Sequence, residues 1–165
     1  MIDPELSSIE IVGVAVRAER EAFDLYLGLA AKVGNPTARA EFERLAGEEA
    51  RHQEWLTAYY KEMTGGSDAP PVPDMRIKMF GPEPSEDMRI AQILDLAITK
   101  ENLSETVYAE AAKRSTDPSG RRMLGELVEF ERSHARRLIA IREVLRRNPA
   151  WIEDPQGRAI QLEGP

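Results

Sequence analysis

Two copies of a Glu-x-x-His pattern are the residues of this chain best suited to bind metal. Glu49 precedes His52 by three positions, and Glu131 precedes His134 by the same spacing. Residues three apart in a helix share one face, so each pair could present a carboxylate and an imidazole to one ion. These are the only two histidines in the chain. Carboxylate and imidazole ligands together suit iron or manganese better than soft metals.

A further pair of glutamates repeats at the same interval as the Glu-x-x-His pairs. An interval of 82 residues separates Glu49 from Glu131, and the same interval separates Glu19 from Glu101. Two Glu-x-x-His helices, with one glutamate from each of two further helices, form the di-iron carboxylate site of a four-helix bundle. The predicted metal ligands are Glu19, Glu49, His52, Glu101, Glu131 and His134.

The charge of this ligand set favours two divalent ions. Four carboxylates would be neutralised by two such ions, whereas four buried carboxylates without metal would repel one another and take up protons. We expect two iron ions, and manganese or zinc could occupy the same site. Glu49 and Glu131 lie nearest the expected pseudo-twofold axis and are the predicted bridging ligands. A single Glu-x-x-His would instead indicate a surface ion-pair face, but the matched duplication favours metal.

One tyrosine follows each upstream glutamate by seven residues. Tyr26 follows Glu19 and Tyr108 follows Glu101, which places each tyrosine two turns along the face of its glutamate. Two interpretations stay open. Each hydroxyl hydrogen-bonds a ligand carboxylate and so contributes to the site, or the rings fill the core while their hydroxyls reach water. The remaining glutamates near the pattern are interpreted as solvated charges: Glu48, Glu54, Glu105 and Glu129.

Local signals predict four helices that carry these residues. A capping box in Ser7–Glu10 opens the first helix, which ends at Gly34-Asn35-Pro36. The third helix is expected to begin at Ser85 as its N-cap and to end near Arg114. Asp117-Pro118 repeats the Asn35-Pro36 break before the fourth helix. The second and fourth helices are expected over about 37–63 and 119–147.

The segment over 64–84 separates the two halves. It contains Gly65-Gly66 and five prolines, which are typical of a connector, with a candidate extended piece over 75–80. Antiparallel neighbours would need only a few connecting residues, whereas this segment could reach about 70 Å and the helices span roughly 40 Å. We therefore expect a long crossover that joins two duplicated helical hairpins in an all-α, ferritin-like four-helix bundle.

The domain organisation follows from these boundaries. One four-helix bundle over 1–149 is expected, with a C-terminal tail over 150–165 that shows no clear structural pattern. In that tail, Trp151 and Ile152 could pack back onto the bundle.

Composition argues against several other classes of protein. The net charge of −7 argues against nucleic acid as a partner. The lack of cysteine excludes disulfides, thiolate zinc sites and iron–sulfur centres built by these residues. No apolar stretch is long enough to span a bilayer, and the first residues lack a secretory signal pattern. We therefore expect no membrane association and a cytoplasmic location.

The sequence around the motifs resembles the rubrerythrin branch of the ferritin-like superfamily. Residues 18–26 and 45–52 carry the resemblance in the first half, and Glu101, Tyr108 and the second Glu-x-x-His carry it in the second. The resemblance implies a di-iron site with the six ligands named above, reduction of hydrogen peroxide as in rubrerythrins proper, and a homodimer. Rubrerythrins proper add a rubredoxin domain with four cysteines, and an extra ligand glutamate at the position of Ser104.

The leading functional hypothesis is an iron-dependent oxidoreductase of peroxidase or ferroxidase type. Hydrogen peroxide or oxygen would oxidise ferrous ions at the site. The alternatives are an iron-binding or iron-delivery protein without significant turnover, and a di-iron oxygenase component that would need an apolar pocket beside the metals. Since no cysteine can build a rubredoxin centre, a separate electron-donor protein or a small reductant would be needed to reduce the site again.

Overall fold

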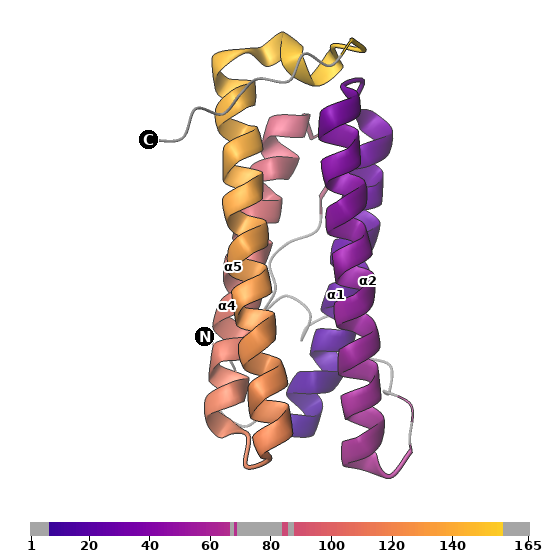
Figure 1. Cartoon of the computed structure of the whole chain (residues 1–165), viewed down its shortest axis with the longest axis vertical. Coiled ribbons are helices and arrows are strands. Elements are labelled where there is room, and N and C mark those ends of the chain that lie inside the picture. Colours follow the sequence, from indigo (N-terminus) through magenta and orange to yellow (C-terminus); the bar gives the residue numbers. More distant parts are fainter. Residues whose placement is uncertain (1–6, 67, 69–83, 86–87, 157–165) are drawn as a thin grey trace.

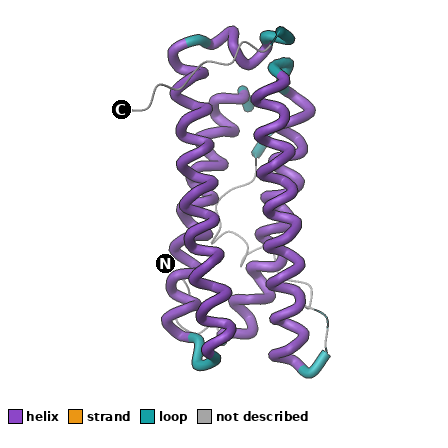
Figure 2. Tube along the Cα trace, in the orientation of Figure 1, coloured by secondary structure: helices purple, strands orange, loops and turns teal. Residues whose placement is uncertain are grey.

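The computed structural model of the chain is a bundle of long helices (Figure 1). It describes residues 7–66, 68, 84–85 and 88–156. The long helices are α1 (Ser8–Lys32), α2 (Pro36–Thr64), α4 (Ile90–Arg114) and α5 (Pro118–Arg147), followed by a short 3-10 helix, η2 (Pro149–Glu153). Across these described residues the structure contains helices and loops but no strand (Figure 2). No helix among them is both long and apolar enough to cross a membrane.

The helix ends follow the capping signals of the sequence. Ser7 and Glu10 form the predicted capping box, in which Glu10 Oε2 accepts the Ser7 N–H at 3.0 Å. The side chains of Asn35 and Asp117 each accept two backbone N–H groups at the starts of α2 and α5, directly before a proline. Gly65 ends α2 in the left-handed conformation that glycine adopts readily, at φ 71°. Local chemistry therefore sets the length of these elements.

The start of α4 differs from the prediction. Ser85 is not its N-cap, because Arg89 is extended at ψ 155° and the helix begins at Ile90. Before that point, the Met88 N–H donates to the Ser85 carbonyl at 3.1 Å. The Met88 side chain packs against the apolar core, and the Gln92 side chain accepts the Arg89 N–H at 2.9 Å. Packing at Met88 and the Gln92 cap thus accompany an N-cap that lies four residues later than predicted.

The long helices form two antiparallel hairpins, α1 with α2 and α4 with α5 (Figure 1). α1 also contacts α4, and α2 contacts α5, which brings the hairpins together as a four-helix bundle. α2 and α4 run in the same direction, and the end of α2 lies at the opposite end of the bundle from the start of α4 (Figure 1). This is the arrangement that a crossover connection requires. The candidate extended piece over 75–80 lies outside the described residues.

Two apolar clusters fill the bundle on either side of a polar layer. One cluster, which includes Phe42, Leu94 and Leu138, lies toward the end that η2 closes. The other includes Leu56 and Leu127 and lies toward the opposite end. On every long helix, the buried glutamate of the predicted ligand set falls between residues of the two clusters. Burial of each large apolar side chain contributes about 1.5–3 kcal/mol, which helps to offset the cost of burying acids.

The residues after α5 fold back onto the turn between α1 and α2. Trp151 and Ile152 are buried in the core, as the sequence predicted. The Ile152 carbonyl accepts the N–H groups of Gly34 at 3.0 Å and Asn35 at 2.9 Å. A Cβ at Gly34 would lie 2.8 Å from the Glu153 carbonyl oxygen, so this close approach requires glycine. Residues 150–153, for which the sequence showed no clear structural pattern, form η2 together with Pro149.

Candidate metal centre

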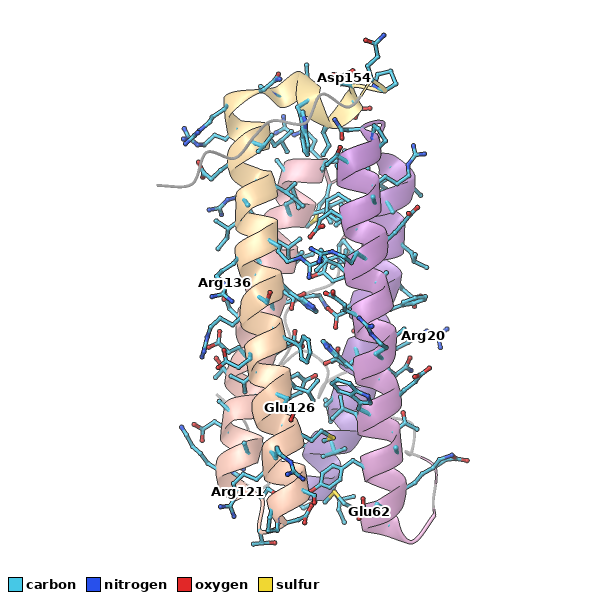
Figure 3. The ribbon with its side chains drawn as sticks, viewed as in Figure 1. Arg20, Glu62, Arg121, Glu126, Arg136 and Asp154 are labelled. Atoms are coloured by element: carbon cyan, nitrogen blue, oxygen red, sulfur yellow. The ribbon has the colours of Figure 1, made fainter. Side chains whose placement is uncertain are left out.

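The six predicted ligands meet between the two apolar clusters. α1 and α4 each contribute one glutamate, and α2 and α5 each contribute a glutamate and a histidine one turn later. All six side chains are buried, and none is more than 3% exposed: Glu19, Glu49, His52, Glu101, Glu131 and His134. Charged side chains elsewhere, such as Arg20 and Arg136, point outward from the bundle (Figure 3). Among the described residues, the four glutamates of this layer carry the only buried carboxyl groups, which distinguishes the layer from the other acidic residues.

The donor atoms form two groups that share two glutamates. Within each group, the donor atoms all lie within 4.8 Å of one another. Glu49 and Glu131 belong to both groups, as bridging carboxylates would. One upstream glutamate and one histidine complete each group: Glu19 with His52, and Glu101 with His134.

Both histidines turn Nδ1 toward the carboxylates. Nδ1 of His52 lies 2.9 Å from Glu49 Oε2 and 3.4 Å from Oε1 of Glu131. Nδ1 of His134 lies 2.8 Å from the other oxygen of Glu49. The two imidazole rings stack with centroids 5.4 Å apart. Each imidazole can thus offer the lone pair of Nδ1 to an ion between it and the shared glutamates.

Several donor atoms of the site make no hydrogen bond of suitable geometry within the described part of the chain, although two of them, Glu49 Oε1 and His134 Nδ1, lie in ion-pair contact with each other. They are Oε1 of Glu49, Oε2 of Glu101, Oε1 of Glu131 and Nδ1 of His134. Leaving one buried polar atom unpaired costs about 1–3 kcal/mol. Two divalent cations would accept lone pairs from these atoms and balance the four carboxylates. The residues present therefore fit a pair of metal ions.

Burial and mutual repulsion perturb the carboxyl groups. Burial, together with the charge of Glu49, raises the pKa of Glu19 to about 8. Burial, with the charges of Glu19 and Glu49, also raises the pKa of Glu131 well above its ordinary value. Burial opposes the ionisation of Glu49 as well, but His134 and His52 hold its pKa below the ordinary value. Without metal, some carboxyl groups of the site therefore retain protons at neutral pH.

The neighbouring acids raise the pKa values of both histidines. Burial alone would lower the pKa of His52, but contacts with Glu19 and Glu49 raise it to about 9. Burial would likewise lower the pKa of His134, but the charge of Glu49 and hydrogen bonds to neighbouring carboxylates raise it to about 12. An imidazole must be neutral to bind metal. Metal binding must therefore displace protons from this cluster.

Each tyrosine hydrogen-bonds a glutamate of the opposite hairpin. The Tyr26 hydroxyl donates to Oε1 of Glu101, and the Tyr108 hydroxyl donates to Oε1 of Glu19. Both tyrosines are fully buried, which excludes the alternative that their hydroxyls reach water. Burial and the adjacent carboxylates raise both pKa values well above the ordinary value, so both hydroxyls remain donors. The other oxygens of Glu19 and Glu101 face the two histidines.

The prediction that Glu48 is a solvated charge is wrong. The Nε2–H of His134 lies 3.0 Å from Glu48 Oε2, and Arg137 donates to the same oxygen at 2.5 Å. The hydrogen bond from His134, with help from Arg137, lowers the pKa of Glu48 to about 2. The sequence did contain a signal for this contact. Arg137 follows His134 by three residues and therefore lies on the same helix face, where it could hold an acid beside the imidazole of His134.

The other glutamates near the motifs face outward, as predicted. Glu54 and Glu129 are exposed. Glu105 is half-buried and pairs with Arg132 at 2.6 Å. Ser104, at the position where the resemblance implies an additional ligand glutamate, offers no carboxylate, and no further carboxylate of the described residues joins the two groups.

Comparison with known proteins places the chain in a family. Its sequence matches the family described as Rubrerythrin over residues 10–142. The chain belongs to the rubrerythrin family. This sequence contains no cysteine. No curated protein matches its sequence.

Two solved structures resemble this rubrerythrin-family chain. The hypothetical protein Pfu-1136390-001 from Pyrococcus furiosus is 26% identical, with a TM-score of 0.78, over 87% of this chain and 92% of that chain. The bacterioferritin of Desulfovibrio desulfuricans, whose diiron site was determined in different catalytic states, is 18% identical. It matches with a TM-score of 0.75 over 95% of this chain and 93% of that chain, and supports the ferritin-like fold. Family membership and the two carboxylate–histidine groups together support a di-iron protein.

Proposed function

We propose that this chain binds two iron ions through the six buried residues and oxidises ferrous iron with hydrogen peroxide or oxygen. The observation that carries the proposal is the sharing of Glu49 and Glu131 by two groups of buried donor atoms. Two ferrous ions held there would together supply two electrons, which with two protons would reduce one hydrogen peroxide to two water molecules, or one oxygen molecule to hydrogen peroxide. Iron suits the mixture of carboxylate and imidazole ligands.

The residues of the chain hold and orient the ligands. Tyr108 holds one oxygen of Glu19 and leaves Oε2 of that glutamate 3.4 Å from Nδ1 of His52. Tyr26 does the same for Glu101, whose Oε2 lies 3.5 Å from Nδ1 of His134. We infer that Glu19 and Glu101 each present one oxygen inward, whereas Glu49 and Glu131, which belong to both donor groups, would be shared by the two ions. The apolar clusters above and below exclude bulk water and strengthen these electrostatic interactions.

Repeated turnover would require electrons from outside the chain. No cysteine is available to build a rubredoxin-type centre, so we propose a separate donor protein or a small reductant. The net charge of −7 would favour a donor with a basic docking face, because complementary charges accelerate encounter. The lack of cysteine also favours one alternative. In that alternative the chain is an iron-binding or iron-delivery protein, in which each iron is oxidised once, or not at all, and then passed on.

Rapid mixing of the diferrous protein separates these functions. Protein loaded anaerobically with two equivalents of ferrous iron would be mixed with hydrogen peroxide and, separately, with oxygen. A rise in ferric absorbance, with one hydrogen peroxide consumed for every two iron ions oxidised, would support peroxidase chemistry. Oxidation that is faster with oxygen than with hydrogen peroxide would support a ferroxidase. Glu49→Ala should abolish the reaction, whereas Glu54→Ala, at an exposed position of the same helix, should not. Oxidation no faster than that of free ferrous iron would leave only the iron-carrier alternative.

A further inference from the structure

The internal duplication allows the two halves of the site to be compared position by position. At the 82-residue interval, the ligand residues and the paired tyrosines are identical in type. Two equivalent positions beside the histidines are not. Glu48 corresponds to Phe130, and Trp55 corresponds to Arg137. The surroundings of His52 and His134 therefore differ although their ligand sets match.

His134 is held by a charged network. Its Nε2–H donates to Glu48 Oε2 at 3.0 Å, and Arg137 Nη1 donates to the same oxygen at 2.5 Å. Arg137 Nε also donates to Glu41 at 2.5 Å, and Glu41 accepts a hydrogen bond from Arg44 at 2.9 Å. This chain of ionic contacts joins α2 to α5 and fixes the outer nitrogen of His134.

On its outer side, the imidazole of His52 contacts two aromatic side chains, Trp55 and Phe130. Its ring centroid lies 5.0 Å from that of Phe130 and 5.9 Å from that of Trp55. The ring centroids of Phe130 and Trp55 lie 5.9 Å apart, and these two side chains are 37% and 39% exposed, respectively. Among the residues that the structure describes, none hydrogen-bonds Nε2 of His52. The outer nitrogen of this imidazole is therefore not fixed by a carboxylate.

This difference affects how each imidazole binds metal. A hydrogen bond from Nε2–H to a carboxylate fixes the tautomer in which Nδ1 carries the lone pair, and it makes that nitrogen a stronger donor. Loss of such a partner typically reduces metal affinity by about 10–100-fold. His134 has this support from Glu48, whereas His52 packs against aromatic rings that accept no comparable hydrogen bond.

We propose that the two metal subsites are inequivalent. The subsite of His134 binds its divalent ion more tightly and fills first, and the subsite of His52 is the weaker, exchangeable one. The inference rests on the two-ion site of the proposed function. It assigns Glu48 as a positioning residue for His134, with Arg137 holding Glu48 in place. The asymmetry comes from one pair of sequence differences beside two ligand sets that are identical in residue type.

Anaerobic titration with Co²⁺ of two matched variants tests the difference directly. His52→Ala retains the His134 subsite, and His134→Ala retains the His52 subsite. We expect His52→Ala to bind its remaining Co²⁺ about 10–100-fold more tightly than His134→Ala does. Adding Glu48→Gln should remove most of that advantage from His52→Ala and leave His134→Ala unchanged. Glu129→Gln, at an exposed position, is the control, and circular dichroism confirms that each variant is helical.

A reciprocal variant tests sufficiency. In the His134→Ala background, Phe130→Glu together with Trp55→Arg would place an acid and a base where Glu48 and Arg137 stand in the other half. We expect this pair of changes to tighten Co²⁺ binding at the His52 subsite. Equal affinities for His52→Ala and His134→Ala, or equal weakening of both by Glu48→Gln, would overturn the inference. Fewer than two Co²⁺ per folded wild-type chain would instead refute the two-ion site itself.

Discussion

The hydroxyl of Tyr26 on α1 donates a hydrogen bond to Glu101 on α4, so one hairpin orients a predicted metal ligand of the other. Tyr108 and Glu19 form the reciprocal pair. The site is therefore assembled only when the two hairpins dock. Folding of the bundle and formation of the site are coupled through these crossed contacts.

Removal of one tyrosine hydroxyl should weaken both stability and metal binding. Tyr26→Phe leaves a buried carboxylate oxygen without its donor, which costs about 1–3 kcal/mol, and we expect metal affinity to fall by up to about 10–100-fold. Thermal melts and ferrous-iron titrations measure the two effects. Tyr60→Phe, which removes a hydroxyl in the apolar cluster around Leu56 and Leu127, is the control. A Tyr26→Phe variant that matched it in both assays would show that the crossed contact has no functional role.

The metal content should approach two ions per chain after anaerobic loading with ferrous iron. Glu49 belongs to both donor groups, so Glu49→Ala should weaken both ions, whereas Glu19→Ala should weaken mainly the ion beside His52. Elemental analysis of desalted protein gives the stoichiometry, with Glu54→Ala as a variant that should retain both ions. A content near zero in folded wild-type protein would contradict the assignment of the site.

Chelation should lower the melting temperature. An ion that binds only the folded state stabilises it by about 2.7 kcal/mol at a hundredfold excess over its dissociation constant. For a chain of this size, this corresponds to a shift of roughly 5–10 °C. Melting curves of chelator-treated and iron-saturated protein measure the shift, and Glu49→Ala should reduce it. Identical curves for the wild-type protein in the two conditions would rule out tight binding.

The stability of the metal-free protein should fall as pH rises from about 6 to 9. The pKa of Glu19 is raised to about 8 from an ordinary value of 4.5. A raised pKa contributes stability that is complete below the unfolded value and is lost as pH passes the folded value. His52, with a pKa raised to about 9, acts in the same direction. Urea denaturation across this range measures the slope.

Glu19→Gln should flatten that dependence, because the amide is neutral at every pH. Metal affinity should show the opposite trend and rise with pH, since ligands must lose protons to bind. Calorimetry of Co²⁺ binding in two buffers with different ionisation enthalpies would count the released protons. Binding without proton release would argue against the protonated metal-free site.

Electron supply should limit turnover. Diferrous protein mixed with excess hydrogen peroxide should react once and then stop, because these residues build no second redox centre. Reduced rubredoxin-like protein or a flavin reductase should restore continuous consumption. That rate should fall with added salt, since screening weakens attraction between exposed charges. Sustained consumption with NADH alone would show that the chain needs no separate electron carrier.

The sequence by itself determined the candidate ligands, their common level along the bundle and the hairpin architecture. Residues three apart share a helix face whatever the rest of the chain does, so each Glu-x-x-His pair was readable from spacing alone. The 82-residue repeat paired each of them with an upstream glutamate. Asn35-Pro36 and Asp117-Pro118 marked helix starts because capping is a local interaction.

Only the tertiary structure decided which side chains meet across helices. The spacing placed Tyr26 on the same helix face as Glu19. The packing of α1 against α4 determines that its hydroxyl donates a hydrogen bond to Glu101 instead. From the sequence of α2 alone, Glu48 is indistinguishable from a surface acid. The packing of α5 against α2 places His134 and Arg137 within hydrogen-bond distance of it. Contacts between helices depend on how the helices rotate and pack, which local periodicity does not encode.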